Sequence, residues 1–234
     1  MQTTLPYNTN SVVFWLDPSE KFITRDKNLN VSSVVDRISG EEIGQSVGGN
    51  PAWSRAGLAG LPALVFNGQS IRLSLPNNIV LSGTKVPFSM TFVAKRNPNF
   101  SGTIVSIGST TNNNPEMAVL SSDPTSVIFL RFDDAELDED SITATDTGGI
   151  HVYTLTYDQK NFVARIDGVE VARAASTTNG HFTADQIVIG TDPDAVVNEF
   201  GPDNYIGSIG QVVMYYGSSP NQNLENLFLQ QYNI

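Results

Sequence analysis

Residues 151–174, HVYTLTYDQKNFVARIDGVEVARA, decide the fold class that this sequence predicts. Residues 152–157 alternate small or β-branched side chains with larger apolar ones, and residues 162–166 resume the alternation after a polar turn. Alternation with period two is typical of strands. Asp167-Gly168 then turns the chain again, because Asp-Gly favours two-residue hairpin loops. The stretch therefore predicts an antiparallel meander of two strands followed by a third.

Short segments of the same kind recur on both sides of this meander, between turns rich in Gly, Pro, Asn and Asp. They combine β-branched or aromatic residues with period-two alternation. We expect strands at residues 11–16, 63–66, 71–75, 88–94, 102–107, 117–120, 127–132, 186–189 and 208–216. Three polar segments are predicted to be surface loops, at residues 17–51, 110–115 and 192–204.

The C-terminus has the pattern of an amphipathic helix. Apolar side chains share one helical face there, at Leu224, Leu227, Phe228 and Tyr232. Ser219 is the expected N-cap, with Pro220 at the first helical position. We expect this helix to pack on an edge or a face of a sheet.

The fold class that follows is all-β, a two-sheet antiparallel jelly-roll sandwich with a short C-terminal helix. The chain has 234 residues, 40% of them hydrophobic, which is enough for one large core. We expect a single domain over residues 11–234, preceded by an uncharged N-terminal arm at residues 1–10.

Charge and composition argue against several classes of function. The formal net charge is -11 and the 13 basic residues are scattered, so binding to a nucleic-acid backbone or an anionic membrane is not expected. Membrane insertion is not expected either, because no run approaches the roughly 18 apolar residues that span a bilayer. The first residues lack the pattern of a secretion signal, so that export route is not expected unless a signal has been removed. Cysteine is absent, which excludes disulfides and thiolate chemistry.

Five motifs, taken in order along the chain, resemble one family of modules. They are FWLD at residues 14–17, VVDRISG at 34–40, GLAGLPALVFNG at 57–68, the hairpin at 151–168, and YIGSIGQVVMYYGSSPNQNLENLFLQQYNI at 205–234. This order is similar to the laminin G-like, concanavalin A-like lectin-glucanase jelly-roll modules of bacterial and phage surface proteins. The resemblance covers nearly the whole chain and implies the same sandwich. Its members include lectins, adhesins, enzyme accessory modules and virion proteins, so architecture is implied more directly than role.

Two positions depart from the pattern of that family. Val35 stands where an aromatic residue often precedes the Ser-Gly pair, and Gln211 stands where an acidic residue is common. Neither departure opposes the fold. The resemblance therefore predicts no ion or ligand contact at these two positions.

The resemblance implies a non-enzymatic binding or structural module. We expect a phage virion surface component, namely a head-decoration, fibre or tail protein, that contacts other virion or surface-assembly proteins and binds host glycans. The chain would then be an oligomer or part of an assembly, located on the virion surface. The alternative is a carbohydrate-binding lectin or adhesin that is extracellular or sits on a bacterial cell surface.

A glycoside hydrolase is a third interpretation. Jelly-roll glucanases use two carboxylates on alternate residues of one strand, which point to the same face. Glu136 and Asp138 have that spacing, but the acidic Glu139 replaces an apolar residue of the glucanase pattern.

The two histidines are a separate candidate for catalysis. His151 lies in a predicted strand and His181 in a predicted Gly-flanked loop, and both are expected to be structural. The sequence therefore predicts no enzymatic activity.

Calcium is the expected cofactor, if the chain binds one, because hard cations need several oxygen ligands. The first candidate site is a dense acidic run formed by Asp133, Asp134, Glu136 and Asp138. A solvated acidic surface is the alternative reading of this run.

A second polar loop is the candidate ligand-binding site, and its acidic residues are an alternative cation site. Its predicted ligand contacts are Asp192, Asp194, Asp203 and Tyr205. The Tyr205 ring would stack on a sugar face while its neighbours bond to the sugar hydroxyls. The alternatives are that Tyr205 anchors the final strand and that the aspartates cap turns.

Overall fold

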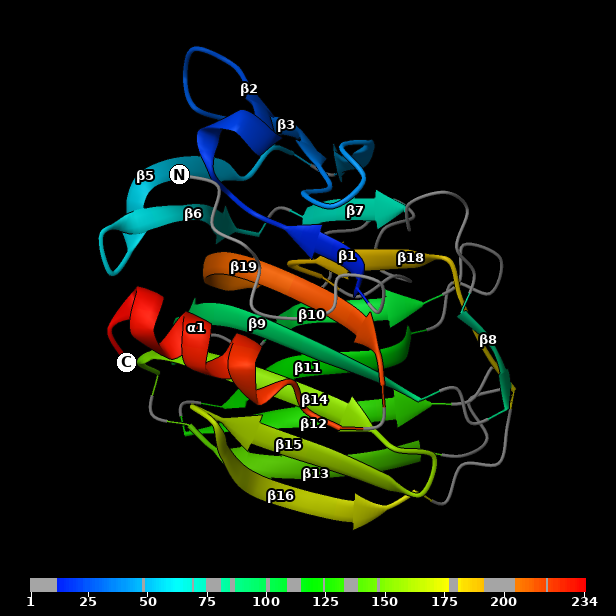
Figure 1. Ribbon diagram of the computed structural model, residues 1–234. Helices are drawn as coiled ribbons and strands as arrows, with labels where there is room; N and C mark the ends of the chain where they lie inside the picture. Colours follow the sequence, from blue (N-terminus) through cyan, green and yellow to red (C-terminus); the bar gives the residue numbers. More distant parts are fainter. Residues whose placement is uncertain are drawn as a thin grey trace.

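The computed structural model has two antiparallel sheets, and the C-terminal helix packs on the outside of one of them (Figure 1). The structure describes residues 12–47, 49–68, 70–74, 81–84, 87–99, 102–108, 115–123, 125–132, 139–146, 148–176, 181–191, 205–217 and 219–234. The expected all-β sandwich with a short C-terminal helix is confirmed.

The first sheet contains the meander that the sequence predicts. It has eight strands in the order β16-β15-β14-β9-β19-β6-β5, with β1 paired to β19. They are β1 (Val12–Leu16), β5 (Ala52–Leu58), β6 (Leu61–Asn67), β9 (Phe88–Arg96), β14 (Ile150–Tyr157), β15 (Asn161–Ile166), β16 (Val169–Ala175) and β19 (Ile206–Tyr216). Asp167 and Gly168 have φ angles of 53° and 76°, as the turn of a two-residue hairpin requires. The meander β14-β15-β16 is confirmed.

The second sheet has nine strands in the order β13-β12-β11-β10-β18-β7-β4-β3-β2. They are β2 (Ile23–Arg25), β3 (Val31–Val35), β4 (Glu42–Val47), β7 (Ser70–Ser74), β10 (Gly102–Gly108), β11 (Pro115–Asp123), β12 (Ser126–Phe132), β13 (Glu139–Thr145) and β18 (Gln186–Ile189). A separate ribbon pairs β8 (Leu81–Thr84) with β17 (His181–Ala184), and η2 (Glu20–Phe22) is a short 3-10 helix.

Two loop predictions are wrong. Residues 17–51 contain β2, β3 and β4, and His181 begins strand β17. The three short strands pair with irregular register between Thr24 and Arg25 and between Val34 and Val35. Such irregularities break the period-two alternation by which a strand is recognised in sequence. Residues 110–114 and 192–204 of the other predicted loops lie outside the described residues.

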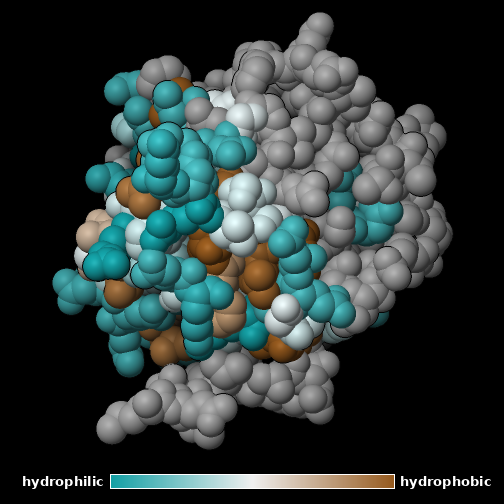
Figure 2. Space-filling view, turned by 90° about the horizontal axis from the view of Figure 1, so that it is seen from above, coloured by the Kyte–Doolittle hydropathy of each residue, from teal (hydrophilic) through white to brown (hydrophobic). Residues whose placement is uncertain are grey.

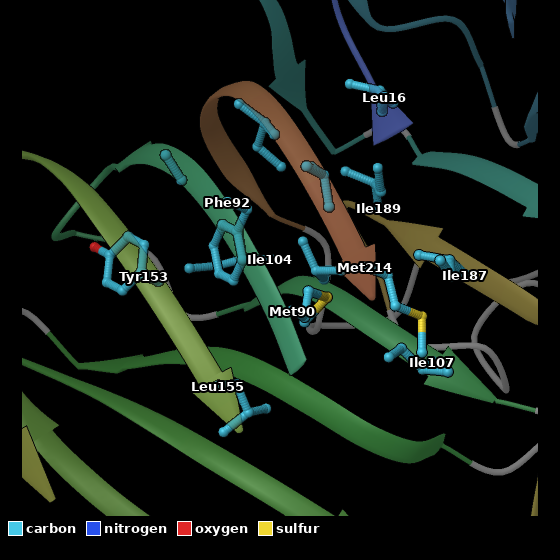
Figure 3. Packing of buried hydrophobic residues seen from close by; sticks show 14 of the residues in the cluster. Leu16, Met90, Phe92, Ile104, Ile107, Tyr153, Leu155, Ile187, Ile189 and Met214 are labelled. Carbon is cyan, nitrogen blue, oxygen red and sulfur yellow. The ribbon is translucent and has the colours of Figure 1, made fainter. Parts of the chain in front are cut away.

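The core lies between the two sheets. Apolar side chains from both sheets are buried there, and Figure 3 shows Met90 and Phe92 of β9, Leu155 of β14, Ile104 of β10 and Ile187 of β18 packed together. Burial of such large side chains is the main favourable contribution to folding. The alternation along β14 is thus explained by a face that points into this core.

The opposite face of the first sheet is also buried, because helix α1 (Gln222–Tyr232) lies across it (Figure 1). Helix side chains pack there with Trp15 of β1 and Val93, Val152 and Val213 of the central strands. The buried helix residues include the predicted Leu224, Phe228 and Tyr232. The expected apolar face of the helix is therefore confirmed.

The predicted N-cap of this helix is wrong. The helix begins at Gln222, and Asn221 is its N-cap. The Asn221 side-chain oxygen accepts a hydrogen bond from the Leu224 amide at 3.1 Å. Ser219 lies too far before the first turn to bond to its free amides, so the amide side chain of Asn221 takes this place.

Candidate functional site

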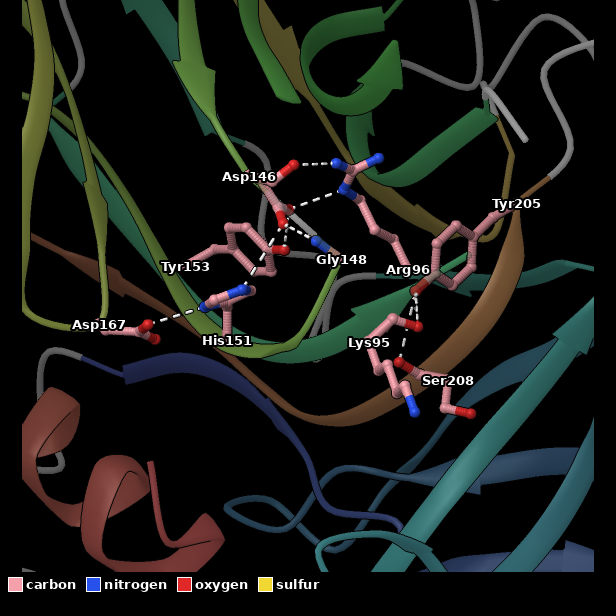
Figure 4. Close-up of polar contacts among 9 residues, drawn as sticks. All are labelled: Lys95, Arg96, Asp146, Gly148, His151, Tyr153, Asp167, Tyr205 and Ser208. Carbon is pink, nitrogen blue, oxygen red and sulfur yellow. Dashed lines mark hydrogen bonds and ion pairs between the residues drawn. The ribbon is translucent and has the colours of Figure 1, made fainter. Parts of the chain in front are cut away.

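Five polar side chains meet at one end of the first sheet and form what we call the polar cluster (Figure 4). Arg96 ends β9, Asp146 follows β13, His151 and Tyr153 belong to β14, and Asp167 lies in the turn between β15 and β16. The pairing of Ile150 with Lys95 brings the start of β14 next to the end of β9. Residues that are far apart in sequence therefore converge through strand register.

An ion pair without solvent exposure forms the centre of the polar cluster. Arg96 Nε donates a hydrogen bond to Asp146 Oδ2 at 2.8 Å, and both side chains are 0% exposed. Arg96 Nη2 also donates to the Asp146 carbonyl. The Tyr153 hydroxyl donates to the same carboxylate, and the Gly148 amide donates to Oδ1 at 2.6 Å. The carboxylate thus accepts three hydrogen bonds, which compensate the cost of burying its charge.

These contacts decide the ionisation of Asp146 and Tyr153. Burial by itself raises the pKa of Asp146, but the bonds from Tyr153, Gly148 and Arg96 together lower that pKa below its ordinary value of 3.8. Burial, and then the charge of Asp146, raises the pKa of Tyr153 well above 10.0. Tyr153 therefore stays a neutral hydrogen-bond donor beside an ionised carboxylate.

His151 connects the ion pair to the turn between β15 and β16. Its Nδ1 lies 2.7 Å from Asp167 Oδ2, and its Nε2 lies 3.6 Å from Asp146 Oδ1. The hydrogen bond with Asp167 raises the pKa of His151 above its ordinary value of 6.5, although burial opposes this shift. The geometry holds a histidine between two carboxylates, which favours the imidazolium form.

We expect the stability of the protein to depend on pH through His151. The pKa of His151 is higher in the folded chain than its ordinary 6.5, so its stabilising contribution is complete below that value and is lost as pH rises through the folded pKa. Urea denaturation should give a free energy of unfolding that falls between about pH 6 and pH 8. His151→Gln should remove this part of the fall, and a variant that keeps the full fall would contradict the assignment.

Chemically, the polar cluster is arranged to hold structure together. Its one hydroxyl is bound to a carboxylate and has a raised pKa, and its arginine is fully buried. None of these features presents an activated nucleophile to a substrate. The cluster instead ties the ends of β9 and β13 to the start of β14 and to the β15-β16 turn.

Tyr205 is the one predicted ligand residue that the structure describes, and it lies in the core. It is 1% exposed, its ring centroid is 6.0 Å from that of Phe66, and its hydroxyl donates to the Lys95 carbonyl at 2.8 Å (Figure 4). A Cβ atom added to Gly207 would lie 2.3 Å from the Tyr205 hydroxyl oxygen. Through these contacts Tyr205 anchors the final strand. Neither face of its ring is exposed for a sugar to stack on.

The other predicted site residues lie outside the described residues. They are Asp133, Asp134, Glu136 and Asp138 of the acidic run, and Asp192, Asp194 and Asp203 of the predicted second site. Their calcium-binding and ligand-binding roles stay predictions. Within the ranges that the structure describes, no group of three or more His, Cys, Asp or Glu side chains is placed to hold a metal ion.

The departure at Gln211 has a structural explanation. Gln211 is 3% exposed, and its Oε1 accepts a hydrogen bond from Trp15 Nε1 at 2.9 Å. Its Nε2 donates to Gln231 Oε1 of α1 at 3.1 Å. A carboxylate accepts but cannot donate in its ionised form. The amide therefore joins the indole of β1 to the helix, which a charged residue would not do.

Comparisons with known proteins place the chain in a class by its fold. No protein-family profile and no curated protein sequence matches it. Solved structures do match over nearly the whole chain, and this likeness supports its assignment to the all-β sandwich class. None of the described helices is long and apolar enough to cross a membrane.

Among the similar structures are binding domains of botulinum neurotoxins. The receptor-binding domain of the C/D mosaic serotype has a TM-score of 0.69 at 14% identity, over 96% of this chain and 52% of that chain. The serotype G binding domain gives 0.68 at 13%, over 94% and 51%. The serotype D ligand-binding domain, solved in complex with N-acetylneuraminic acid, gives 0.65 at 16%, over 95% and 52%. This chain thus spans about half the length of these domains, and the likeness shows the fold.

Proposed function

We propose that this chain is a non-enzymatic, glycan-binding module of the laminin G-like jelly-roll type. The observation that carries the proposal is the match of 95% of the chain to a ligand-binding domain that was solved with a sugar acid bound. The order of five sequence motifs supports the laminin G-like assignment independently. Fold alone does not determine function, so the site itself needs a test.

The described geometry supports a binding role over a catalytic one. The polar cluster uses its titratable groups to bond to one another, and α1 covers the outer face of the first sheet. The part of that face beneath α1 is therefore closed to a ligand. Loops at the ends of the strands, and the second sheet, are the surfaces at which a module of this fold binds its ligand.

We further propose that the module works on a virion surface, in contact with other proteins of the assembly. The support is the resemblance to modules of phage and bacterial surface proteins. A secreted or cell-surface lectin is the alternative location for the same binding activity. Light scattering separates the two, because an assembly component forms a defined oligomer or co-purifies with a particle whereas an isolated lectin module stays monomeric.

The glycan-binding activity is tested with a glycan array. We expect the purified chain to bind a subset of the glycans, and to bind them more weakly in chelator than in calcium if the acidic loops hold a cation. The Glu136→Gln/Asp138→Asn double variant is the control for hydrolysis. If the chain is not a glycoside hydrolase, the wild type and this variant should both leave the glycans intact. Failure to bind any glycan in either buffer would refute the proposed activity.

A further inference from the structure

Two arginines converge on one carboxylate at the end of the molecule that carries η2, β2, β3 and β5. Arg25 Nη2 donates a hydrogen bond to Glu20 Oε1, and Arg55 Nη2 lies 3.6 Å from Glu20 Oε2. Seen from above, the end of the molecule that carries these elements has a largely hydrophilic described surface (Figure 2). We call Arg25 and Arg55 the arginine pair. Guanidinium groups recognise carboxylates by geometry as well as by charge.

The arginine pair is built on a fixed aromatic support. The Arg25 guanidinium lies over the Trp53 ring, 4.5 Å from its centroid. Trp53 Nε1 donates to the Pro18 carbonyl at 2.7 Å, and its backbone amide donates to the Leu29 carbonyl at 2.7 Å. The stacked guanidinium is therefore oriented before any ligand arrives, and preorganisation of this kind raises affinity.

Glu20 holds the arginine pair weakly and incompletely. The Arg55 side chain is 79% exposed and that of Glu20 is 58% exposed, and ion pairs so exposed contribute little to stability. Elsewhere in the chain, Arg165 and Arg173 bind their carboxylates through both Nε and Nη2. Arg25 contacts Glu20 through Nη2, while its Nε is buried without a hydrogen-bond partner. A carboxylate from outside can therefore make a better set of bonds than Glu20 makes.

Charge limits the kind of anion that can bind to the arginine pair. Lys21 and Lys27 lie close to Arg25 in sequence and are exposed, although acidic residues outnumber basic ones 24 to 13 in the chain. Charges interact over about 8–10 Å at ordinary salt. An extended polyanion such as a nucleic acid or an anionic membrane reaches farther than this and is repelled by the net charge of -11. A single carboxylate at the end of a neutral glycan reaches the cations without that repulsion.

The hairpin tip beside the arginine pair offers an apolar contact. Leu29 is 40% exposed and has a φ of 68°, a conformation that is uncommon for a residue other than glycine. Asp26 Oδ1 holds this tip by accepting the amides of Asn28 and Asn30 at 2.8 and 2.9 Å. A rigid, exposed leucine next to two cations suits a sugar that combines a carboxylate with apolar C–H or N-acetyl groups.

We propose that Arg25 and Arg55 bind the carboxylate of a terminal acidic sugar, and that Glu20 occupies this position when the sugar is absent. The inference rests on the proposed glycan-binding function and names the class of glycan. Glu20 is then an internal competitor, because its carboxylate must leave the arginine pair before the ligand carboxylate enters.

The test is a titration of the full chain with sialyllactose, followed by NMR or calorimetry, with lactose as the neutral probe. Arg55→Gln and Arg25→Gln should each weaken the binding of sialyllactose about tenfold, which corresponds to about 1.4 kcal/mol. Glu20→Gln should strengthen it severalfold, since it removes the competitor. Arg173→Gln is the matched control, because Arg173 is 47% exposed and pairs with Glu170 away from this corner.

Each outcome separates this inference from the proposed function. Arg55 is too exposed for its replacement to unfold the chain, so a loss of affinity in Arg55→Gln reports on the site itself. Equal binding of sialyllactose and lactose, or unchanged affinity in both Arg55→Gln and Glu20→Gln, would overturn the acidic-sugar site. In either case, glycan binding on the array would leave the proposed function standing, whereas a chain that binds no glycan overturns both.

Discussion

Replacing Asp146 with asparagine is expected to lower the free energy of unfolding by about 3–5 kcal/mol, which would be among the largest effects of any single substitution. The change removes the charge that neutralises Arg96, and both side chains are 0% exposed. It also takes a charged acceptor from the Tyr153 hydroxyl and the Gly148 amide. Urea denaturation followed by tryptophan fluorescence measures the loss, because Trp15 and Trp53 are both buried.

Two controls separate this effect from a general loss of charge. Glu170→Gln breaks the exposed ion pair with Arg173 and should change stability by less than about 1 kcal/mol. The triple replacement Arg96→Met, Asp146→Leu and Tyr153→Phe removes every charge and hydroxyl of the central ion pair together. It should be more stable than Asp146→Asn, because no uncompensated charge stays buried, although the Gly148 amide and the residue 146 carbonyl each lose a hydrogen-bond partner. A loss below about 1 kcal/mol in Asp146→Asn would mean that water or another group compensates Arg96.

Replacing Phe92 with alanine is expected to lower the free energy of unfolding by about 3–5 kcal/mol as well. Phe92 is 0% exposed and lies between the sheets, where its ring stacks on Tyr153 with centroids 5.1 Å apart (Figure 3). Truncation removes buried apolar surface and leaves a cavity in strand β9, which pairs with both β14 and β19. Neighbouring strands cannot close the cavity without breaking their register.

The matched control for Phe92 is an aromatic residue in the neighbouring strand. Tyr216 ends β19 and is 43% exposed, so Tyr216→Ala should change stability by about 0.5 kcal/mol or less. Phe92→Leu should fall between the two, since it keeps most of the apolar volume. Equal losses in Phe92→Ala and Tyr216→Ala would show that burial in the structure does not describe the core in solution.

The sequence predicted the elements whose signals are local. The β14-β15-β16 meander follows from alternation and an Asp-Gly turn, and the apolar face of α1 follows from helical spacing. It missed several strands, among them β2 to β5, β8 and β17, and it placed the helix N-cap at Ser219 in place of Asn221. The start of the helix depends on one hydrogen bond, which the backbone amide of Leu224 donates to the side chain of Asn221.

The candidate sites were much less accessible to sequence reasoning. Acidic loops and an aromatic residue attracted the predictions, yet Tyr205 is a core anchor. Arg96 carried one usable signal, since it is a charged residue that shares a strand face with the apolar Phe92 and Ala94. The arginine pair carried none, because Arg25 and Arg55 look like ordinary exposed basic residues in the sequence.

The sequence by itself determined the all-β class, the local hairpins, the amphipathic helix and the acidic surface, because periodicity and turn chemistry act over a few neighbouring residues. Tertiary structure alone decided which distant strands pair, and so which side chains meet. Asp146 reaches Arg96 across 50 positions through the ends of β13 and β9, and Glu20 meets Arg25 and Arg55 where η2, β2 and β5 converge. The physical reason is that strand register and sheet packing depend on the whole core, whereas each sequence signal reports only its own segment.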